Sequence, residues 1–194
     1  MPALHDNQLP AAGAARSDLL ETKLFALLGM VNDWLKFAET KNGVVLTASG
    51  GALALLLNRV DGASSISTMT WVLGGTGGSC LLLSLLSGLL SFFPRTTAPR
   101  LPKRSAGAAA DVDNLYYFGH LARYDAPLLA REINRRYLNA PDDAIGEAAL
   151  ALATQVVINA RITLWKLNLF SFAVALFGAG FTLSMFGVAI LALA

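Results

Sequence analysis

The sequence contains few charged residues, and two long stretches contain almost none. Only 14% of the 194 residues are Asp, Glu, Lys or Arg, whereas a soluble domain usually has about 25%. No charged side chain follows Lys166, and Asp61 is the only one between Val60 and Arg95. A soluble core of this size could not bury stretches of that length, so the composition indicates a membrane protein rather than a soluble helical bundle.

Residue types that build active sites are also scarce. Cys80 is the only cysteine, which excludes a disulfide framework and a cysteine-based metal site. His5 and His120 are too far apart for a metal-binding motif, and the sequence has no nucleophile elbow. The glycine-rich run 74–79 lacks the Lys-Ser/Thr ending of a phosphate-binding loop. A net charge of +2 does not indicate nucleic-acid binding. We therefore expect no enzymatic activity, no metal, no cofactor and no nucleic-acid partner.

Three apolar segments, 43–60, 70–93 and 167–194, predict three transmembrane helices. The first is short, since its uncharged part has 15 residues and would be about 22 Å long against a hydrocarbon core of about 30 Å. Lys41 and Arg59 at its ends can extend their charged groups to the membrane surface. Segments 43–60 and 70–93 form a hairpin over 43–93, so we expect an all-α integral membrane protein.

The N-terminal part predicts a leader and an amphipathic helix. Residues 1–16 lack the continuous apolar core of a signal peptide, and we expect a disordered leader. Ser17 is suited to cap a helix over 17–42, in which apolar residues recur at spacings of three and four. The helix can pack on a partner or lie on the inner membrane surface, and the mixed charges of its polar face favour packing. The apolar stripe consists of Leu20, Leu24, Leu27, Val31, Trp34 and Ala38.

The region between the second and third membrane segments begins basic and continues helical. Residues 94–110 form a basic Pro/Ala-rich linker whose cations can rest on anionic lipid headgroups. Residues 111–166 form a cytoplasmic helical region without the alternating pattern of a strand. Its last helix runs directly into segment 167–194. We expect three helices there: one over 112–124, one from Asp125 with Pro127 in its first turn, and one over 144–166 behind a cap at Asp142 or Asp143.

The distribution of lysine and arginine predicts the orientation. Residues 1–42 contain four, residues 58–70 contain one, and residues 94–166 contain ten. The positive-inside rule therefore places the N-terminus and the 94–166 region in the cytoplasm of a multi-pass inner-membrane protein.

Small residues at spacings of four mark faces on which membrane helices can approach closely. We expect these faces to associate within one chain or between chains, with pore lining as the alternative. They are the pairs Gly74 and Gly78, Ser84 and Gly88, and Gly180 and Ser184, and the run Ser171, Ala175 and Ala179.

A basic and aromatic cluster in the 111–166 region is a candidate ligand site. Guanidinium groups suit a phosphate, an aromatic face suits a flat base, and an amide can read the edge of that base. The alternative is a solvated helix face near an anionic membrane. Arg161 and Asn159 directly precede the last membrane helix, so a ligand bound there could displace that helix. The cluster combines Arg131, Arg135, Arg136 and Tyr137 with Tyr116, Tyr117 and Tyr124, and amides are available from Asn114, Asn134, Gln155 and Asn159.

Two motifs resemble the transmembrane effectors of Pycsar antiphage systems, and the resemblance covers nearly the whole chain after the leader. The second motif is Gln155-Val156-Val157-Ile158-Asn159-Ala160-Arg161-Ile162, with Lys166 shortly after it. The first motif, which is the more specific, is Asn32-Asp33-Trp34-Leu35-Lys36-Phe37-Ala38-Glu39-Thr40-Lys41-Asn42-Gly43.

The resemblance implies a protein that binds cyclic UMP or cyclic CMP, which a partner cyclase makes upon infection. It implies that the protein then impairs the inner membrane and stops growth of the infected cell. We expect a symmetric oligomer, because three helices alone enclose little water. The rival hypotheses are a ligand-independent membrane scaffold and a constitutive holin-like pore former. The residues expected to bind ligand are Asn32, Asp33, Lys36, Lys41, Tyr116, Tyr117, Arg131, Arg135, Arg136, Gln155, Asn159 and Arg161.

Overall fold

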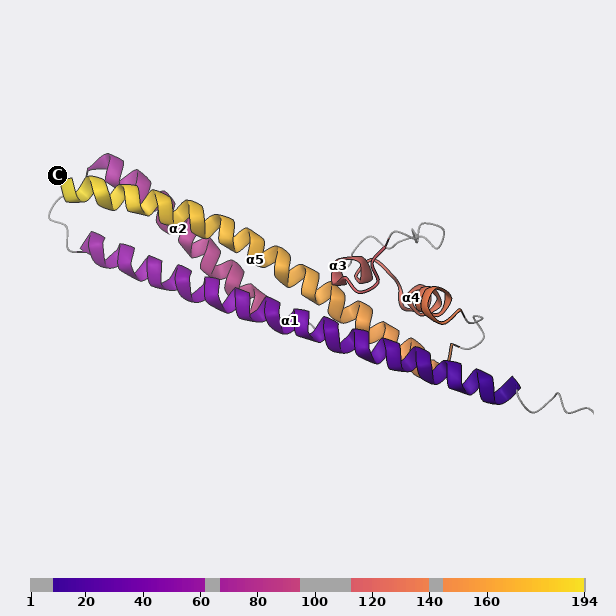
Figure 1. Cartoon of the computed structure of the whole chain (residues 1–194). Coiled ribbons are helices and arrows are strands. Elements are labelled where there is room, and N and C mark those ends of the chain that lie inside the picture. The colour runs from indigo at the N-terminus through magenta and orange to yellow at the C-terminus, as the bar shows by residue number, and fades with distance from the viewer. Residues whose placement is uncertain (1–8, 62–66, 95–112, 140–144, 194) are drawn as a thin grey trace, which may run out of the picture. The chain divides into compact units, whose positions relative to one another are not determined.

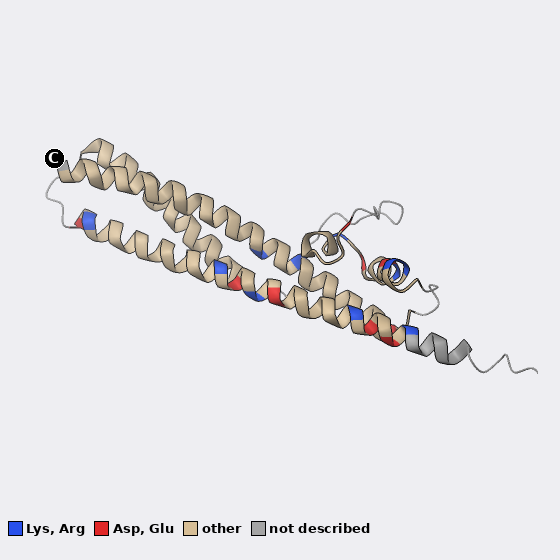
Figure 2. Cartoon of the chain, in the orientation of Figure 1, with Lys and Arg blue, Asp and Glu red and all other residues tan. Residues whose placement is uncertain are grey.

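The computed structural model describes residues 9–61, 67–94, 113–139 and 145–193, and these are helical apart from short turns (Figure 1). The elements in chain order are α1 (Leu9–Asp61), α2 (Thr68–Phe92), α3 (Phe118–Leu121), α4 (Ala126–Ile133), the π-helical turn η1 (Asn134–Leu138) and α5 (Glu147–Leu193). Three of them, α1, α2 and α5, are long and apolar enough to cross a membrane. Their charge-free stretches are visible in Figure 2, where α2 carries no charged side chain.

The helix α1 begins at Leu9, so Ser17 lies inside the helix and does not cap it as predicted. Its hydroxyl instead lies 3.5 Å from a carboxylate oxygen of Glu21, one turn further along. The predicted amphipathic helix over 17–42 and the first membrane segment are parts of this one helix. Residues 1–8 of the predicted leader lie outside the described residues.

The chain divides into two compact units. The first, which we term the mixed unit, comprises Met1–Leu35 and Arg95–Leu164. The second, which we term the apolar unit, comprises Lys36–Pro94 and Trp165–Ala194. The helices α1 and α5 each contribute residues to both units.

Hydroxyl groups join the three helices inside the apolar unit. Ser84 on α2 donates to the carbonyl oxygen of Ala173 on α5 at 2.7 Å, and its own oxygen lies 2.8 Å from the hydroxyl of Ser49 on α1. Because the Ser84 proton is used toward Ala173, Ser49 is the donor in the second bond. Both buried hydroxyls are thereby hydrogen-bonded within the protein, as polar groups in membrane helices require.

Glycines bring α2 and α5 into close contact. A Cβ atom added at Gly77 would lie 2.8 Å from the carbonyl oxygen of Gly180, and one at Gly180 would lie 2.8 Å from that of Gly77. Of the predicted small-residue faces, Ser84, Gly88, Gly180 and Ser184 are buried. The run Ser171, Ala175 and Ala179 is exposed, so of the two predicted kinds of association it does not make the one within the chain.

The outer surface of the apolar unit is hydrophobic. Leu55 is 69% exposed, Phe186 62% and Trp71 58%. Exposed apolar side chains of this size would be costly in water, but they suit contact with lipid tails.

The mixed unit has a core of its own. The stripe residues Leu20, Leu24, Leu27 and Val31 of α1 are buried there. Trp34, the next stripe position, is 38% exposed, and its ring centroid lies 5.2 Å from that of Phe118. Facing core residues from the rest of the unit are Leu115, Leu121, Tyr124, Leu129, Ile133, Ala153 and Val156.

The prediction of one helix over 112–124 is wrong, because within the described residues 113–124 only Phe118–Leu121 is helical. The cause is Asn114, whose side-chain oxygen accepts the backbone N–H of Tyr116 at 2.9 Å, while its carbonyl accepts that of Tyr117 at 3.1 Å. Short polar side chains that bind nearby backbone in this way favour turns over helix.

The start of α4 confirms the prediction for that helix. Asp125 caps it by accepting the N–H of Leu128 at 2.9 Å, and Pro127 lies in the first turn. The following turn η1 is capped by Asn139, whose φ of 47° is left-handed, a conformation that asparagine tolerates better than most residues. The predicted caps Asp142 and Asp143 of the last helix lie outside the described residues.

Candidate functional site

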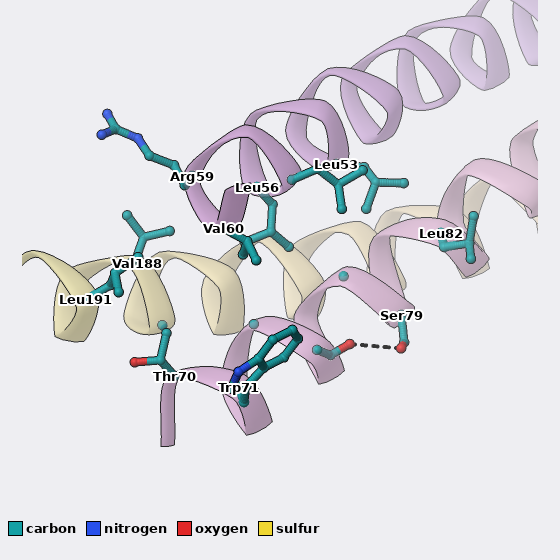
Figure 3. Close-up of a pocket in the computed structure, with 15 residues that line it drawn as sticks. Leu53, Leu56, Arg59, Val60, Thr70, Trp71, Ser79, Leu82, Val188 and Leu191 are labelled. Atoms are coloured by element: carbon teal, nitrogen blue, oxygen red, sulfur yellow. Dashed lines mark hydrogen bonds between the residues drawn. The ribbon is translucent and has the colours of Figure 1, made fainter. Parts of the chain in front are cut away.

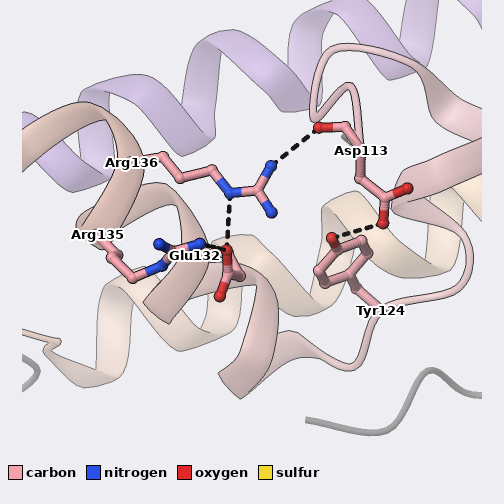
Figure 4. A network of polar contacts seen from close by, with 5 residues as sticks. All are labelled: Asp113, Tyr124, Glu132, Arg135 and Arg136. Atoms are coloured by element: carbon pink, nitrogen blue, oxygen red, sulfur yellow. Dashed lines mark hydrogen bonds and ion pairs between the residues drawn. The ribbon is translucent and has the colours of Figure 1, made fainter. Parts of the chain in front are cut away.

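Two neighbouring arginines share one carboxylate at the end of α4 (Figure 4). Arg135 and Arg136 both contact Oε2 of Glu132, at 2.9 Å and 2.8 Å. The α-helical spacing of three and four residues places both cations over the same acid. Arg131, one turn earlier, is exposed and donates through Nε to the carbonyl of Pro127 at 3.3 Å.

Arg135 and Arg136 differ in their exposure to solvent. The Arg136 side chain is 13% exposed and also donates to the backbone carbonyl of Asp113 at 3.0 Å. The carboxylate of Asp113 in turn accepts the hydroxyl of buried Tyr124 at 2.9 Å. Arg136 therefore holds the turn before α3 against α4. The Arg135 side chain is 55% exposed, so an anion can reach its guanidinium from solvent.

An aromatic pair lies on the same unit. The rings of Tyr116 and Tyr137 meet edge to face with centroids 5.7 Å apart, and the two residues are 47% and 41% exposed. The Nζ atom of Lys23, on α1, lies 5.4 Å from the centroid of the Tyr137 ring. Partial burial raises the pKa of Tyr137 above its usual value, and neighbouring Tyr116 adds to this while Arg136 opposes it. The hydroxyl thus stays protonated and able to donate a hydrogen bond at neutral pH.

The amide and arginine residues of α5 hold the mixed unit together. Asn159 donates to the side-chain oxygen of Asn32 on α1 at 2.8 Å. Arg161 donates through Nε to the carbonyl of Ala122 at 2.9 Å and through a terminal nitrogen to that of Tyr124 at 2.8 Å. Arg161 thereby satisfies two backbone carbonyl groups in the segment between α3 and α4.

Comparison with known proteins decides the family. A family model described as the Pycsar effector protein domain matches residues 23–193. The chain belongs to the Pycsar effector family. No curated protein and no solved structure matches it. Membership implies an antiphage membrane effector, activated by a cyclic nucleotide signal from a partner cyclase.

In this Pycsar effector, the structure groups some of the predicted ligand residues and separates others. Asn32 lies with Asn159, Arg135 lies with Arg136, and Tyr116 lies with Tyr137, all within the mixed unit. Elsewhere in that unit, Tyr117 packs on Phe118 and His120, while Asp33 and Gln155 are exposed. Lys36 and Lys41 belong instead to the apolar unit.

Charged side chains of α1 and α5 meet within the apolar unit. The carboxylate of Glu39 on α1 accepts a hydrogen bond from Nζ of Lys166 on α5 at 2.6 Å. The Nζ atom of Lys41 lies 4.4 Å and 5.1 Å from the ring centroids of Phe37 and Phe170. These contacts bind α1 to α5 within the apolar unit.

Sequence reasoning missed Lys23, Glu132 and Asp113. No local pattern in the sequence connects Lys23 with Tyr137. Glu132 could have been found, since an acid three and four residues before two arginines is a recognisable helical pairing. Within the described residues, no group of three or more His, Cys, Asp or Glu could hold a metal ion.

Proposed function

We propose that this Pycsar effector binds cyclic UMP or cyclic CMP on the mixed unit and then impairs the inner membrane, which stops growth of the infected cell. The observation that carries the proposal is the exposed Tyr116–Tyr137 pair with Lys23 and Arg135 as reachable cations on the same unit. In this proposal a tyrosine ring stacks on the pyrimidine, while the cations neutralise the single phosphate.

Two groups of predicted residues have different roles in this proposal. Arg131, Arg135, Tyr116 and Tyr137 contact ligand. Arg136, Arg161, Asn32 and Asn159 position the segments that carry those residues, which their hydrogen bonds to protein groups support.

Activation is a shift between a resting and an active arrangement. A ligand drives such a shift only by its tighter binding to the active one. Lys23 belongs to α1 and Tyr137 to η1. A nucleotide bound between these two side chains therefore changes how α1 packs against η1 in the mixed unit. The helices α1 and α5 continue without a break into the apolar segments, which makes them the transmitters.

We further propose a cytoplasmic N-terminus, a symmetric oligomer and a leak formed by rearranged membrane helices. The lysine and arginine distribution supports the orientation. The exposed run Ser171, Ala175 and Ala179 supports contact between copies, because small residues allow membrane helices to approach closely.

Ligand-dependent leakage tests the proposed function. The full chain would be reconstituted in dye-loaded liposomes and challenged separately with cyclic UMP, cyclic CMP, cyclic AMP and cyclic GMP. We expect release with one pyrimidine nucleotide and none with the purine nucleotides. Release without ligand would favour a constitutive pore, and no release despite verified insertion would favour a scaffold, so either result would overturn the proposal.

A further inference from the structure

Two apolar cavities in the apolar unit meet at one arginine. The larger has a volume of about 430 Å³ and the smaller about 270 Å³. Both are lined by Leu56, Arg59 and Val188, so Arg59 borders each of them. Figure 3 shows the larger cavity, with the Arg59 guanidinium extended away from the helices.

Glycines make room for the larger cavity. Gly74, Gly75 and Gly78 of α2 and Gly187 of α5 contribute to its lining. A Cβ atom added at Gly75 would meet nothing within 4 Å, so this wall is open. Trp71 also lines the cavity, and an amphipathic indole is typical of the membrane–water interface.

Arg59 carries a positive charge near the end of α1, where Asp61 is the nearest acidic residue in the sequence. It is exposed, and it makes no hydrogen bond or ion pair with the residues that the structure describes. It is also the only lysine or arginine between Lys41 and Arg95. A cation at the rim of two apolar cavities is complementary to an amphiphile that has one anionic group and two hydrocarbon chains.

We propose that these cavities form a binding site for one anionic phospholipid. One acyl chain lies in each cavity, and the phosphate lies on the guanidinium of Arg59. Trp71 flanks the headgroup region of the larger cavity. This proposal does not depend on the nucleotide proposal, since all its residues belong to the apolar unit.

The size of the cavities favours a lipid over a helix from a second copy. An α-helix is about 10–12 Å wide with side chains and rises about 5.4 Å per turn, so one turn occupies on the order of 400–600 Å³. The larger cavity would therefore hold about one turn, and the smaller less than one. Acyl chains are thin enough to fill both.

Tryptophan quenching by brominated lipids tests the site. The full chain with Trp34→Phe and Trp165→Phe retains Trp71 as its single tryptophan. It would be reconstituted in vesicles with acyl-brominated phosphatidylglycerol or, separately, acyl-brominated phosphatidylcholine at equal mole fractions. We expect Trp71 to show a preference of about fivefold for phosphatidylglycerol, the effect of one cation near anionic headgroups. Arg59→Gln should abolish that preference and Arg59→Lys should retain most of it.

A matched pair of glycine variants separates the cavity from general enrichment of anionic lipid around a cation. Gly75→Leu adds a large side chain to the lining of the larger cavity, whereas Gly51→Leu adds the same side chain to an exposed α1 position that lines neither cavity. Only Gly75→Leu should remove the preference. Equal quenching by both lipids, or equal effects of the two variants, would overturn the proposal. So would weak quenching that rises as the protein is diluted in the bilayer, because that result indicates a second copy in the cavity.

Discussion

Arg135 and Arg136 share the carboxylate of Glu132, and their burial assigns them different physical roles. A buried guanidinium that loses its bonds leaves acceptors unsatisfied, whereas an exposed ion pair contributes little to stability. The guanidinium of Arg136 is largely buried, and it bonds to Glu132 and to the carbonyl of Asp113. Arg135 forms an exposed ion pair, because more than half of its side chain is exposed.

Substitution of the two arginines should therefore separate folding from ligand binding. We expect Arg136→Gln to lower the free energy of unfolding by about 1–3 kcal/mol, the cost of losing hydrogen bonds to a charged group. Arg135→Gln should change it by less than about 1 kcal/mol while weakening pyrimidine-nucleotide binding at least tenfold. Thermal unfolding and isothermal titration calorimetry on the same preparations measure the two effects. Unchanged nucleotide affinity in a folded Arg135→Gln variant would contradict the assignment of Arg135.

For single residues, the sequence shows which residue types are present, but it does not show which of them are in contact in the folded protein. The arginine cluster is recognisable because its members are close in sequence. The Lys23–Tyr137 contact is not, because it joins α1 to η1 through the tertiary fold. The same holds for Arg161, whose acceptors are backbone carbonyls near α3 and carry no side-chain signature.

The helices that were predicted correctly are those whose position is set by one local sequence signal. The spans were predicted because uninterrupted apolar residues identify a membrane helix directly. The start of α4 was predicted because Asp125 and Pro127 act within one turn. The helix over 112–124 was wrong because the hydrogen bonds of Asn114 outweigh the helical spacing around it. The sequence placed Gly180 on a small-residue face but did not predict its contact with Gly77 of α2, since spacing alone does not fix which helices meet or their register.

The contact between α2 and α5 can be tested with two glycines of α5. Alanine at Gly180 would bring its Cβ within 2.8–2.9 Å of backbone and side-chain atoms of α2, whereas alanine at Gly178 would meet nothing within 4 Å. Both changes raise helix propensity equally, so their difference reports the steric effect. We expect Gly180→Ala to be less stable than Gly178→Ala by about 1–3 kcal/mol, as for overpacked cores. Thermal unfolding in detergent, followed by circular dichroism, measures this difference, and equal stabilities would show that the helices do not approach at Gly180.

For the whole molecule, charge is concentrated on the segments outside the predicted spans. The loop segment 58–70 contains one lysine or arginine, whereas 94–166 contains ten. Insertion retains lysine- and arginine-rich segments in the cytoplasm, and acidic residues contribute little to this bias. Asp61 can therefore be replaced without altering the signal that sets the orientation.

The orientation can be measured by cysteine labelling in a chain whose only native cysteine is removed by Cys80→Ala. Thr22→Cys and Asp61→Cys each add one thiol at an exposed position of α1, on opposite sides of the first membrane segment. A membrane-impermeant maleimide should label Asp61→Cys in intact spheroplasts, and should label Thr22→Cys only after the membrane is permeabilised. Labelling of both in detergent controls for thiol reactivity. If Thr22→Cys reacted first, the N-terminus would lie outside, and a nucleotide made in the cytoplasm could not reach the tyrosine pair, because Tyr137 contacts Lys23 one residue from Thr22.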